Sequence, residues 1–469
     1  MPTVTLSPLD QSSQREYVHF LLCFPLTLDD QTSSSDVRTH IQQGFDALSV
    51  TYPFLKGTIR LKESSSEPAG LVEIAYDPES PALKIESNVL NERFPTFEDI
   101  TLHKVSVREL DGRLCQPPSS APSEHTPIFV LRANFVRGGL LLCVTAHHAA
   151  FDATGVDVLV RLLARCCSSK SDEFEVDSRS NDRSSLFFGG SLDEQAERDR
   201  NYHRNIAAQT NVENMDAAKS ARENRDPVDT EEKPRPTSSR IFSFPAKSLA
   251  RLKAIALLFL PPGVPWISTQ DALAALIWLC VCRAQSPNLP SDTTCTLNIS
   301  VNGRSRMEPP LPATYLGVCV FGAITQMKLH DLLSSEGDNE SFAQRISSLA
   351  AQIRSSVNTV DNKRIRSTVR WVLSQEDVRF VHTSVDSLVL GNYLYLTSWA
   401  DLSLYNADFG GLLKKPTLVR LLNQEADGLG VILPRRSDGS LEITLRMFAD
   451  SMERLENDSL WNAYCQLVC

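Results

Sequence analysis

The side chains best suited to chemistry lie in one short segment of the N-terminal half, where His147, His148 and Asp152 stand within six residues. An apolar run over 139–146 comes directly before them and is typical of a strand buried on both faces. Apolar residues at helical spacing over 156–163 follow. A loop between such a strand and such a helix presents reactive groups on a rigid support. Because an imidazole suits general-base chemistry near neutral pH, His148 is the candidate base.

Asp152, four residues after His148, is placed to cap the following helix and to orient the loop that carries the imidazole. The spacing alone leaves a second interpretation open, in which His148 is a buried histidine bonded to a backbone carbonyl and Asp152 is only an N-cap. A His-x-x-x-Asp pattern by itself often arises by chance. We expect His147 to be a packing or hydrogen-bonding neighbour.

Apolar periodicity predicts the elements that position this loop. The first half has a predicted strand over 17–25 and a helix over 37–48 that ends before Pro53. In the second half, Ser268 and Asp271 have the spacing of a capping box before a predicted helix. The further predictions there are strands over 240–244, 294–301 and 393–399, helices over 272–279 and 342–357, and a hairpin of strands over 430–433 and 441–445. Strands and helices mix in both halves, so the predicted class is α/β (α+β) with mixed sheets.

A highly charged stretch separates the two halves. Between Lys170 and Arg235, 27 of 66 residues are charged, about 41% against 22% for the whole chain, and such a segment cannot bury much surface. We therefore expect a solvated crossover over 181–239, with a surface helix near 192–206. It would join an N-terminal domain of residues 1–180 to a C-terminal domain of residues 240–469.

Composition argues against several classes of protein. The net charge of −10 disfavours a bulk nucleic-acid binder and a protein held on anionic membranes by charge. No run of ~18 apolar residues predicts a membrane span. The 11 cysteines contain no C-x-x-C pair, and the first residues lack the basic region of a signal peptide. We expect reduced thiols, a cytoplasmic location and no metal site.

Four blocks of the sequence resemble the BAHD acyltransferases and follow that family's order. They are residues 148–152, similar to its HxxxD motif, residues 268–278, residues 302–312, and residues 406–411, similar to its DFGWG motif. Residues 6–10 and 397–405 are also similar to the family. The resemblance therefore spans the whole chain.

The chain departs from the family's pattern at three points. Ala153 stands where the family has a glycine after the HxxxD aspartate, and Gly155 comes two residues later. The tryptophan of DFGWG is absent, and Val318 stands where the family usually has an asparagine. These departures resemble the divergent fungal branch, which includes trichothecene and alkaloid O-acetyltransferases of the chloramphenicol acetyltransferase-like superfamily.

The resemblance implies two chloramphenicol acetyltransferase-like domains with an active-site tunnel between them, entered by coenzyme A and the acceptor from opposite sides. It implies transfer of an acyl group from acyl-CoA, by default acetyl-CoA, to a hydroxyl of a fungal terpenoid, polyketide or alkaloid. His148 would take the acceptor's proton, Asp152 would hold the loop, and no acyl-enzyme or permanently bound cofactor would be involved. A monomer is expected.

The resemblance also implies contacts with the substrates. Thr397 would donate a hydrogen bond to the developing oxyanion, and Ser398 and Trp399 would line the tunnel along coenzyme A. Ser268 would approach the pantetheine arm. The alternatives are that these are ordinary strand residues and that Ser268 is a plain N-cap. Two basic residues, Arg251 and Lys253, are candidates for the phosphates by position.

The second signature block carries a structural expectation. Asp408, followed by Phe409 and Gly410, would form an ion pair with Arg304, remote from the chemistry. Removing one partner of a buried pair costs ~3–5 kcal/mol, so lost activity in an Asp408 variant would not prove a catalytic role.

Other functions stay open on the sequence. Two histidines before x-x-x-Asp also resemble condensation domains of peptide synthetases, which join carrier-bound acyl groups. The same fold can be diverted to cyclisation or elimination with His148 still the base, and a non-catalytic ligand-binding relative is the alternative from another class. The sequence does not specify the acceptor, the acylated position or the length of the acyl group.

Overall fold

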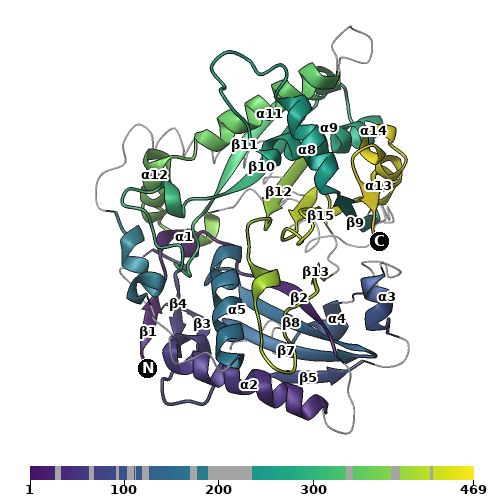
Figure 1. Ribbon diagram of the computed structural model, residues 1–469. Helices are drawn as coiled ribbons and strands as arrows, with labels where there is room; N and C mark the ends of the chain where they lie inside the picture. The colour runs from purple at the N-terminus through teal and green to yellow at the C-terminus, as the bar shows by residue number, and fades with distance from the viewer. Residues whose placement is uncertain are drawn as a thin grey trace, which may run out of the picture.

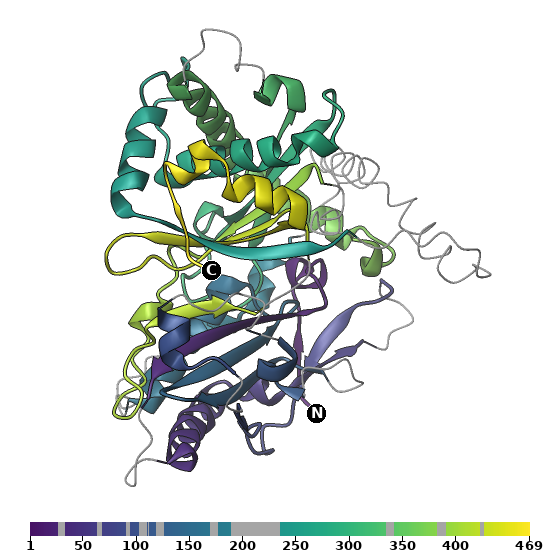
Figure 2. The same cartoon turned by 90° about the vertical axis from the view of Figure 1, so that its right-hand side faces the viewer.

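The computed structural model describes residues 1–26, 33–62, 68–90, 94–102, 110, 112–118, 126–168, 177–188, 235–333, 342–381, 391–422 and 426–469. These form two bodies, each a mixed sheet with helices packed on it. The body built mainly from the N-terminal half lies below the other in Figure 1, and Figure 2 shows the same two layers from the side. The predicted α/β class is confirmed.

The main sheet of the lower body has the strand order β13-β2-β8-β7-β5. Only β5 runs parallel to its neighbour among these strands. The strands are β2 (Tyr17–Pro25), β5 (Glu86–Val89), β7 (Phe129–Val136), β8 (Gly139–His147) and β13 (Leu418–Leu421). Helices α2 (Ser34–Thr51) and α5 (Ala153–Cys167) pack together beside this sheet (Figure 1). Every residue of β8 is buried, as the apolar run predicts.

A smaller sheet and several short helices complete the lower body. The sheet has the order β1-β4-β3-β6, with strands β1 (Thr3–Thr5), β3 (Thr58–Leu61), β4 (Val72–Ala75) and β6 (Thr126–Pro127). The short helices are α1 (Pro8–Gln11), α3 (Phe97–Thr101) and α4 (Gly112–Cys115).

The upper body contains a seven-stranded sheet of order β11-β10-β12-β14-β15-β9-β16. The neighbours β10, β12 and β14 are parallel, and the others are antiparallel. The strands are β9 (Thr237–Phe244), β10 (Thr294–Asn302), β11 (Val320–Lys328), β12 (Tyr393–Ser398), β14 (Leu429–Ile432), β15 (Leu441–Phe448) and β16 (Gln466–Leu467). The β14–β15 pair confirms the predicted hairpin.

Helix α9 (Thr269–Gln285) forms the centre of the upper core. It contacts five other helices of the described chain and is buried on nearly every side, which explains why its residues are apolar all round. Its predicted capping box is present. The other helices are α8 (Ala246–Ala256), α10 (Leu329–Leu333), α11 (Phe342–Asn358), α12 (Asn362–Leu373), α13 (Ala449–Glu456) and α14 (Ser459–Asn462).

The two bodies do not divide the chain as the sequence predicts. Strand β13 comes from the C-terminal half, yet it pairs with β2 at the edge of the lower sheet. Leu404, Phe409 and Leu413 on the same excursion are buried in the lower core. The predicted C-terminal domain of residues 240–469 therefore gives a segment to the lower body. A four-residue strand with a distant partner leaves no local signal of this exchange.

The predicted solvated crossover of 181–239 is wrong at both ends. Residues 178–186 form two short 3₁₀ turns, in which the side chains of Arg183 and Leu186 are buried. At the other end, β9 begins at Thr237. The predicted surface helix of 192–206 lies outside the described residues.

In the described part of the chain, no helix has the length and apolarity needed to cross a membrane. Among the same residues there is no group of three or more His, Cys, Asp or Glu side chains placed to hold a metal ion.

Candidate active site

A cavity of about 370 Å³ lies between the two bodies. The lower body contributes residues of β2 and the loop from β8 to α5. The upper body contributes residues of β10, β11, β12, β14 and α12. Four residues predicted for the site line it together: His148, Thr397, Ser398 and Trp399. Asp152 also reaches its wall.

His148 stands directly after β8, where the sheet fixes its backbone. Its amide donates a hydrogen bond of 2.8 Å to the carbonyl of Glu16. Its ring Nδ1 lies 3.0 Å from the hydroxyl of Ser13. One hydrogen bond thus holds the backbone of His148, and one contact holds its ring beside the cavity. Sequence reasoning missed Ser13, because its contact with His148 spans 135 residues.

His147 is not among the residues that line the cavity, and it serves packing. Its ring meets Tyr17 edge-on at 5.2 Å, and its Nδ1 accepts a hydrogen bond from the amide of Ala149. Burial lowers the pKa of His147 to about 4, so the ring is neutral at pH 7. The prediction of a packing neighbour is confirmed.

Asp152 is bonded away from the imidazole, to three groups around the start of α5. Oδ1 accepts from the amide of Gly155 at 2.8 Å, which caps the helix. Both carboxylate oxygens accept from the Arg304 guanidinium, at 2.7 and 2.8 Å. Oδ2 also accepts from the amide of Cys319 at 3.0 Å. The carboxylate thus fastens the loop after His148 to the upper body.

The predicted ion pair between Asp408 and Arg304 is wrong. Arg304 is buried and donates to Asp152 and to the carbonyls of Tyr315 and Gly317. Asp408 is exposed, and its Oδ1 accepts from the amide of Gly410. The physical reason is position, because Arg304 faces the start of α5 whereas Asp408 lies on the excursion to the lower body.

The rest of the second signature block is structural. Phe409 is fully buried and meets Phe24 edge-on at 5.2 Å. Gly410 has φ +73°, and a Cβ there would lie 2.8 Å from the backbone of Ser168. A side chain at this position would strain the turn that aims Phe409 into the core.

A second buried ion pair lies next to the first. Arg183 donates to Asp10 at 2.9 Å, and Asp10 also accepts from the amide of Val318 at 2.8 Å. Burial raises the pKa of Asp10, and Arg183 opposes that rise. We call Asp10, Arg183, Asp152 and Arg304 the ion-pair cluster.

The ion-pair cluster joins distant parts of the chain. Its two carboxylates bind successive amides of the segment 315–319, which comes from the C-terminal half. Gly155 allows this close approach, because a Cβ there would lie 2.1 Å from the carbonyl oxygen of Leu316. Sequence reasoning assigned no role to Asp10 or Arg183, since the two partners are 173 residues apart in the chain.

Strand β12 brings the remaining predicted residues to the cavity. Thr397 is half-buried in its wall. Trp399 packs edge-on against Phe20 of the lower body at 5.5 Å, and Ser398 accepts a bond from the amide of Ala400. These side chains form part of the upper body's share of the cavity wall, and β2 contributes to the lower body's share.

The cavity contains a second histidine that sequence reasoning missed. His19 lines the wall, and its Nδ1 lies 2.9 Å from the hydroxyl of Thr145. Burial lowers the pKa of His19 to about 4, so it presents a neutral imidazole.

Ser268 lies outside this cavity. Its hydroxyl donates to the carboxylate of Asp271 at 2.8 Å and accepts from the Asp271 amide at 3.1 Å. Asp271 in turn forms an ion pair with Arg354. Ser268 is thus the N-cap of α9, and its contact with the pantetheine arm stays a prediction.

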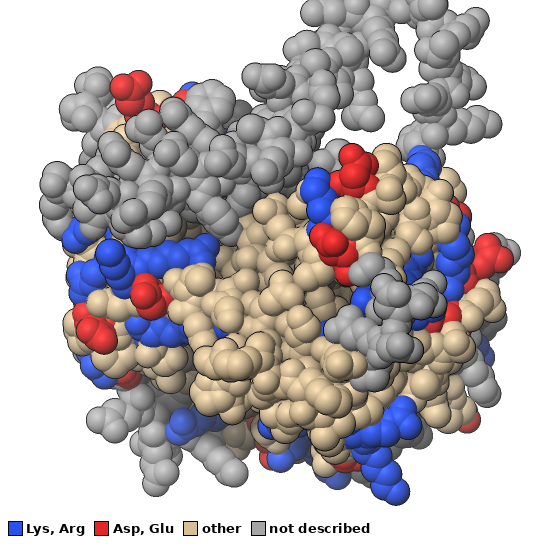
Figure 3. Space-filling view, turned by 90° about the horizontal axis from the view of Figure 1, so that it is seen from above, with Lys and Arg blue, Asp and Glu red and all other residues tan. Residues whose placement is uncertain are grey.

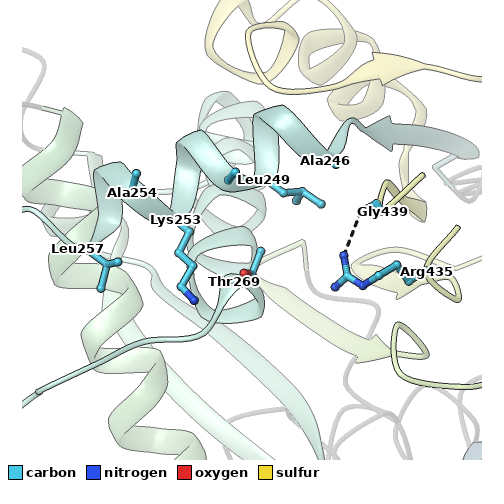
Figure 4. Close-up of a pocket in the computed structure, with 9 residues that line it drawn as sticks. Ala246, Leu249, Lys253, Ala254, Leu257, Thr269, Arg435 and Gly439 are labelled. Carbon is cyan, nitrogen blue, oxygen red and sulfur yellow. Dashed lines mark hydrogen bonds between the residues drawn. The ribbon is translucent and has the colours of Figure 1, made fainter. Parts of the chain in front are cut away.

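A second hollow, of about 420 Å³, opens beside the start of α9. Figure 4 shows Lys253 of α8 next to Thr269, with Arg435 on the β14–β15 hairpin facing them. Arg435 donates to the carbonyl of Gly439 at 3.1 Å. Arg251, the other predicted phosphate contact, lies elsewhere, since its guanidinium stacks on Tyr464.

The second hollow adjoins the end of the strand that lines the cavity. The amide of Trp399 donates to the carbonyl of Ile432 at 2.8 Å, and the amide of Arg435 donates to that of Ala400 at 3.2 Å. Lys253 and Arg435 thus lie near one end of β12. The candidate base, His148, lies beside the cavity that β12 lines. Sequence reasoning missed Arg435, because an arginine-rich hairpin loop usually predicts a solvated turn.

Comparisons with known proteins agree with this geometry. The Transferase family matches residues 2–460. Trichothecene 3-O-acetyltransferase TRI101 of Fusarium sporotrichioides is 26% identical, covering 96% of this chain and 94% of its own length. Eremophilane O-acetyltransferase ORF8 of Penicillium roqueforti is 25% identical, covering 97% of this chain and 96% of its own length.

Solved structures share the fold. The crystal structure of F. graminearum TRI101 complexed with coenzyme A and T-2 mycotoxin has a TM-score of 0.82 at 21% identity and covers 100% of both chains. Vinorine synthase has a TM-score of 0.63 at 17% identity, over 97% of this chain and 92% of its own. The two-domain chloramphenicol acetyltransferase-like architecture is confirmed. The chain belongs to the Transferase family, as its resemblance to the BAHD acyltransferases predicts, and it is an acyltransferase.

Proposed function

We propose that the enzyme transfers an acetyl group from acetyl-CoA to a hydroxyl of a fungal secondary metabolite, with His148 as the general base. The observation that carries this proposal is the fixed imidazole of His148, bonded to Ser13 at 3.0 Å beside a cavity lined by both bodies. The relatives named above are O-acetyltransferases for a trichothecene and an eremophilane, which supports the donor and the acceptor class.

The contact with Ser13 is compatible with the tautomer that this chemistry needs. With the proton on Nδ1, the ring donates to the Ser13 hydroxyl and keeps the Nε2 lone pair for the acceptor. Nε2 takes the hydroxyl proton as the acceptor oxygen attacks the thioester carbonyl. The tetrahedral intermediate then expels the CoA thiolate, which takes the proton from Nε2 of His148. Such a base contributes ~10²–10⁴ in rate.

Thr397 is proposed to stabilise the negative oxygen of that intermediate. It lines the same cavity as His148 but comes from the upper body. A hydroxyl aimed at a developing oxyanion is worth ~3 kcal/mol in comparable sites. The two bodies would thus supply one group each to the transition state.

The second hollow is proposed to hold the phosphates of coenzyme A. Lys253 and Arg435 bring two cations to it, and Thr269 adds a hydroxyl at the start of α9. Trp399 and Ser398 would then flank the pantetheine arm between this hollow and His148. Ser268 contributes through the cap that shapes α9.

The walls of the cavity suit a bulky, mainly apolar acceptor. Val18, Phe20, Val320 and Phe321 present hydrocarbon surface, and His19 offers a neutral hydrogen-bonding group among them. A single chain supplies both walls, so a monomer suffices. We also propose a cytoplasmic location.

The test is thiol release from acetyl-CoA with a panel of terpenoid, polyketide and alkaloid alcohols. We expect acceptor-dependent release that falls about 10²–10⁴-fold in His148→Ala. His330→Ala, which removes an exposed histidine on α10, is the matched control and should keep full activity. Equal release by His148→Ala would overturn the assigned base. Stabilisation by coenzyme A without release on any acceptor would favour a binding-only protein.

A further inference from the structure

The connection between α8 and α9 exposes a cluster of large apolar side chains. Residues 257–266 read Leu-Leu-Phe-Leu-Pro-Pro-Gly-Val-Pro-Trp. Leu258 is 65% exposed, Phe259 51% and Trp266 54%. With Leu257 they make four of the fourteen exposed large hydrophobic side chains in the described residues, within ten positions. Apolar surface gathered in this way marks contact with another molecule or with a membrane.

The loop is anchored at both ends and open at its tip. The amide of Phe259 donates to the hydroxyl of Ser347 on α11 at 3.2 Å. At the other end, the Arg354 guanidinium stacks on the Trp266 ring at 4.3 Å. Gly263, near the middle, has φ +92°, and a Cβ there would meet no atom within 4 Å. The apolar side chains are therefore presented outward on an ordered turn.

The backbone of this loop is suited to leave water. Pro261, Pro262 and Pro265 have no N–H group. Each backbone donor that enters an apolar phase without a partner costs free energy, so a proline-rich tip lowers the cost of insertion. A convex tip with few donors also gives a protein partner little to bind by hydrogen bonds.

The stretch of sequence that contains the loop differs in charge from the chain as a whole. No Asp or Glu occurs between Glu232 and Asp271, although the whole chain carries −10. The neighbouring helix α8 carries Lys247, Arg251 and Lys253. The upper end of the molecule is seen in Figure 3, where a broad central area of the described surface has no charged side chain and both basic and acidic side chains lie at its edges.

We propose that residues 257–266 form a membrane-contact loop that docks on a bilayer containing anionic phospholipids. Leu258, Phe259 and Trp266 enter the interface between headgroups and acyl chains, and the segment 233–270, which has no Asp or Glu, does not add repulsion from anionic headgroups. The negative net charge rules out attraction of the whole molecule, so apolar insertion supplies the binding and local charge orients it. Docking of this kind is independent of the proposed acyl transfer.

The experiment is co-sedimentation of the full chain with phosphatidylcholine vesicles, with and without phosphatidylserine. We expect binding that phosphatidylserine strengthens and that falls about tenfold in the double variant Leu258→Ser/Phe259→Ser. Tryptophan emission should shift to the blue on binding, and Trp266→Phe should remove most of that shift.

Leu61→Ser/Val89→Ser is the matched control, because these two side chains are 63% and 74% exposed on the lower body. It should sediment like the unaltered chain, and both double variants should keep the same melting temperature. Equal sedimentation of both double variants, or none by the unaltered chain, would overturn the proposal. Self-association without lipid, abolished by Leu258→Ser/Phe259→Ser, would instead assign the loop to a second copy of the chain and overturn it as well.

Discussion

Two segments carry the sequence motifs that point to this family, and they differ in how their aspartates are placed. Asp152 follows His148 in the lower body and is buried against Arg304. Asp408 lies on the excursion from the upper body, exposed, with only a local bond to the amide of Gly410 among the described residues. The aspartates of the two motifs therefore have different roles. Asp152 joins the two bodies, whereas Asp408 shapes a turn.

The two segments differ in the interactions that stabilise them. In the first, the ion-pair cluster and two backbone amides hold the loop after His148. In the second, the buried ring of Phe409 does the packing, and Gly410 allows the turn. A motif is informative about fold in both cases, but only the first reaches the cavity.

The largest expected effect is on the first segment. Arg304→Leu leaves the Asp152 carboxylate buried without its charge partner, and should lower the free energy of unfolding by about 3–5 kcal/mol. Urea unfolding measures it. Asp152→Asn combined with Arg304→Leu should cost less than the sum of the two single changes, because they share one interaction. Losses below about 1 kcal/mol would show that the pair does not fasten the bodies.

Ser13→Ala tests the chemistry of the same segment. Losing a hydrogen bond to an imidazole that becomes charged in the reaction should lower kcat about 10- to 100-fold with little change in KM. Ser13→Thr keeps a hydroxyl and should restore most of kcat. Ser12→Ala is the control, because the neighbouring hydroxyl donates to the backbone carbonyl of Leu9. A rise in KM alone would contradict the tautomer role.

A smaller effect is expected at the second hollow, outside both segments. Lys253→Ala and Arg435→Ala should each raise the KM for acetyl-CoA about three- to tenfold and leave kcat nearly unchanged. The difference should shrink at high salt, because screening weakens contacts of exposed charges. Lys247→Ala, on the same helix but not in the wall of the hollow, is the control. Unchanged KM in both variants would move the phosphates elsewhere.

The smallest effect is expected at Asp408. Asp408→Ala should change neither the melting temperature nor the rate of thiol release measurably, because the side chain is exposed and its bond is local. Phe409→Ala in the same motif should cost about 3–5 kcal/mol of stability. A large loss with Asp408→Ala would break the contrast between the two aspartates.

Local patterns predicted much of this molecule. The apolar run of β8, the capping box of α9 and the β14–β15 hairpin all follow from residues within a few positions of one another. His148 could be predicted because its loop lies between two such elements. Thr397, Ser398 and Trp399 could be placed beside it only through the family resemblance.

What the sequence could not predict depends on distant contacts. Asp10 and Arg183 are 173 residues apart, and Asp152 and Arg304 are 152 apart. The pairing of β13 with β2 and the approach of Arg435 to Lys253 also bring together residues that are far apart in the sequence. Charge and spacing cannot choose among dozens of possible carboxylate and guanidinium partners, whereas the folded core permits very few.

The pairing of β13 with β2 has a consequence during synthesis of the protein on the ribosome. The edge of β2 is made early in synthesis, yet the strand that covers it begins at Leu418. At ~5–20 residues per second, roughly 20–80 s pass between the two. During that interval an apolar strand edge lies open to other nascent chains. Expression yield should therefore respond to chaperone supply and to translation speed more strongly than the stability of the finished enzyme suggests.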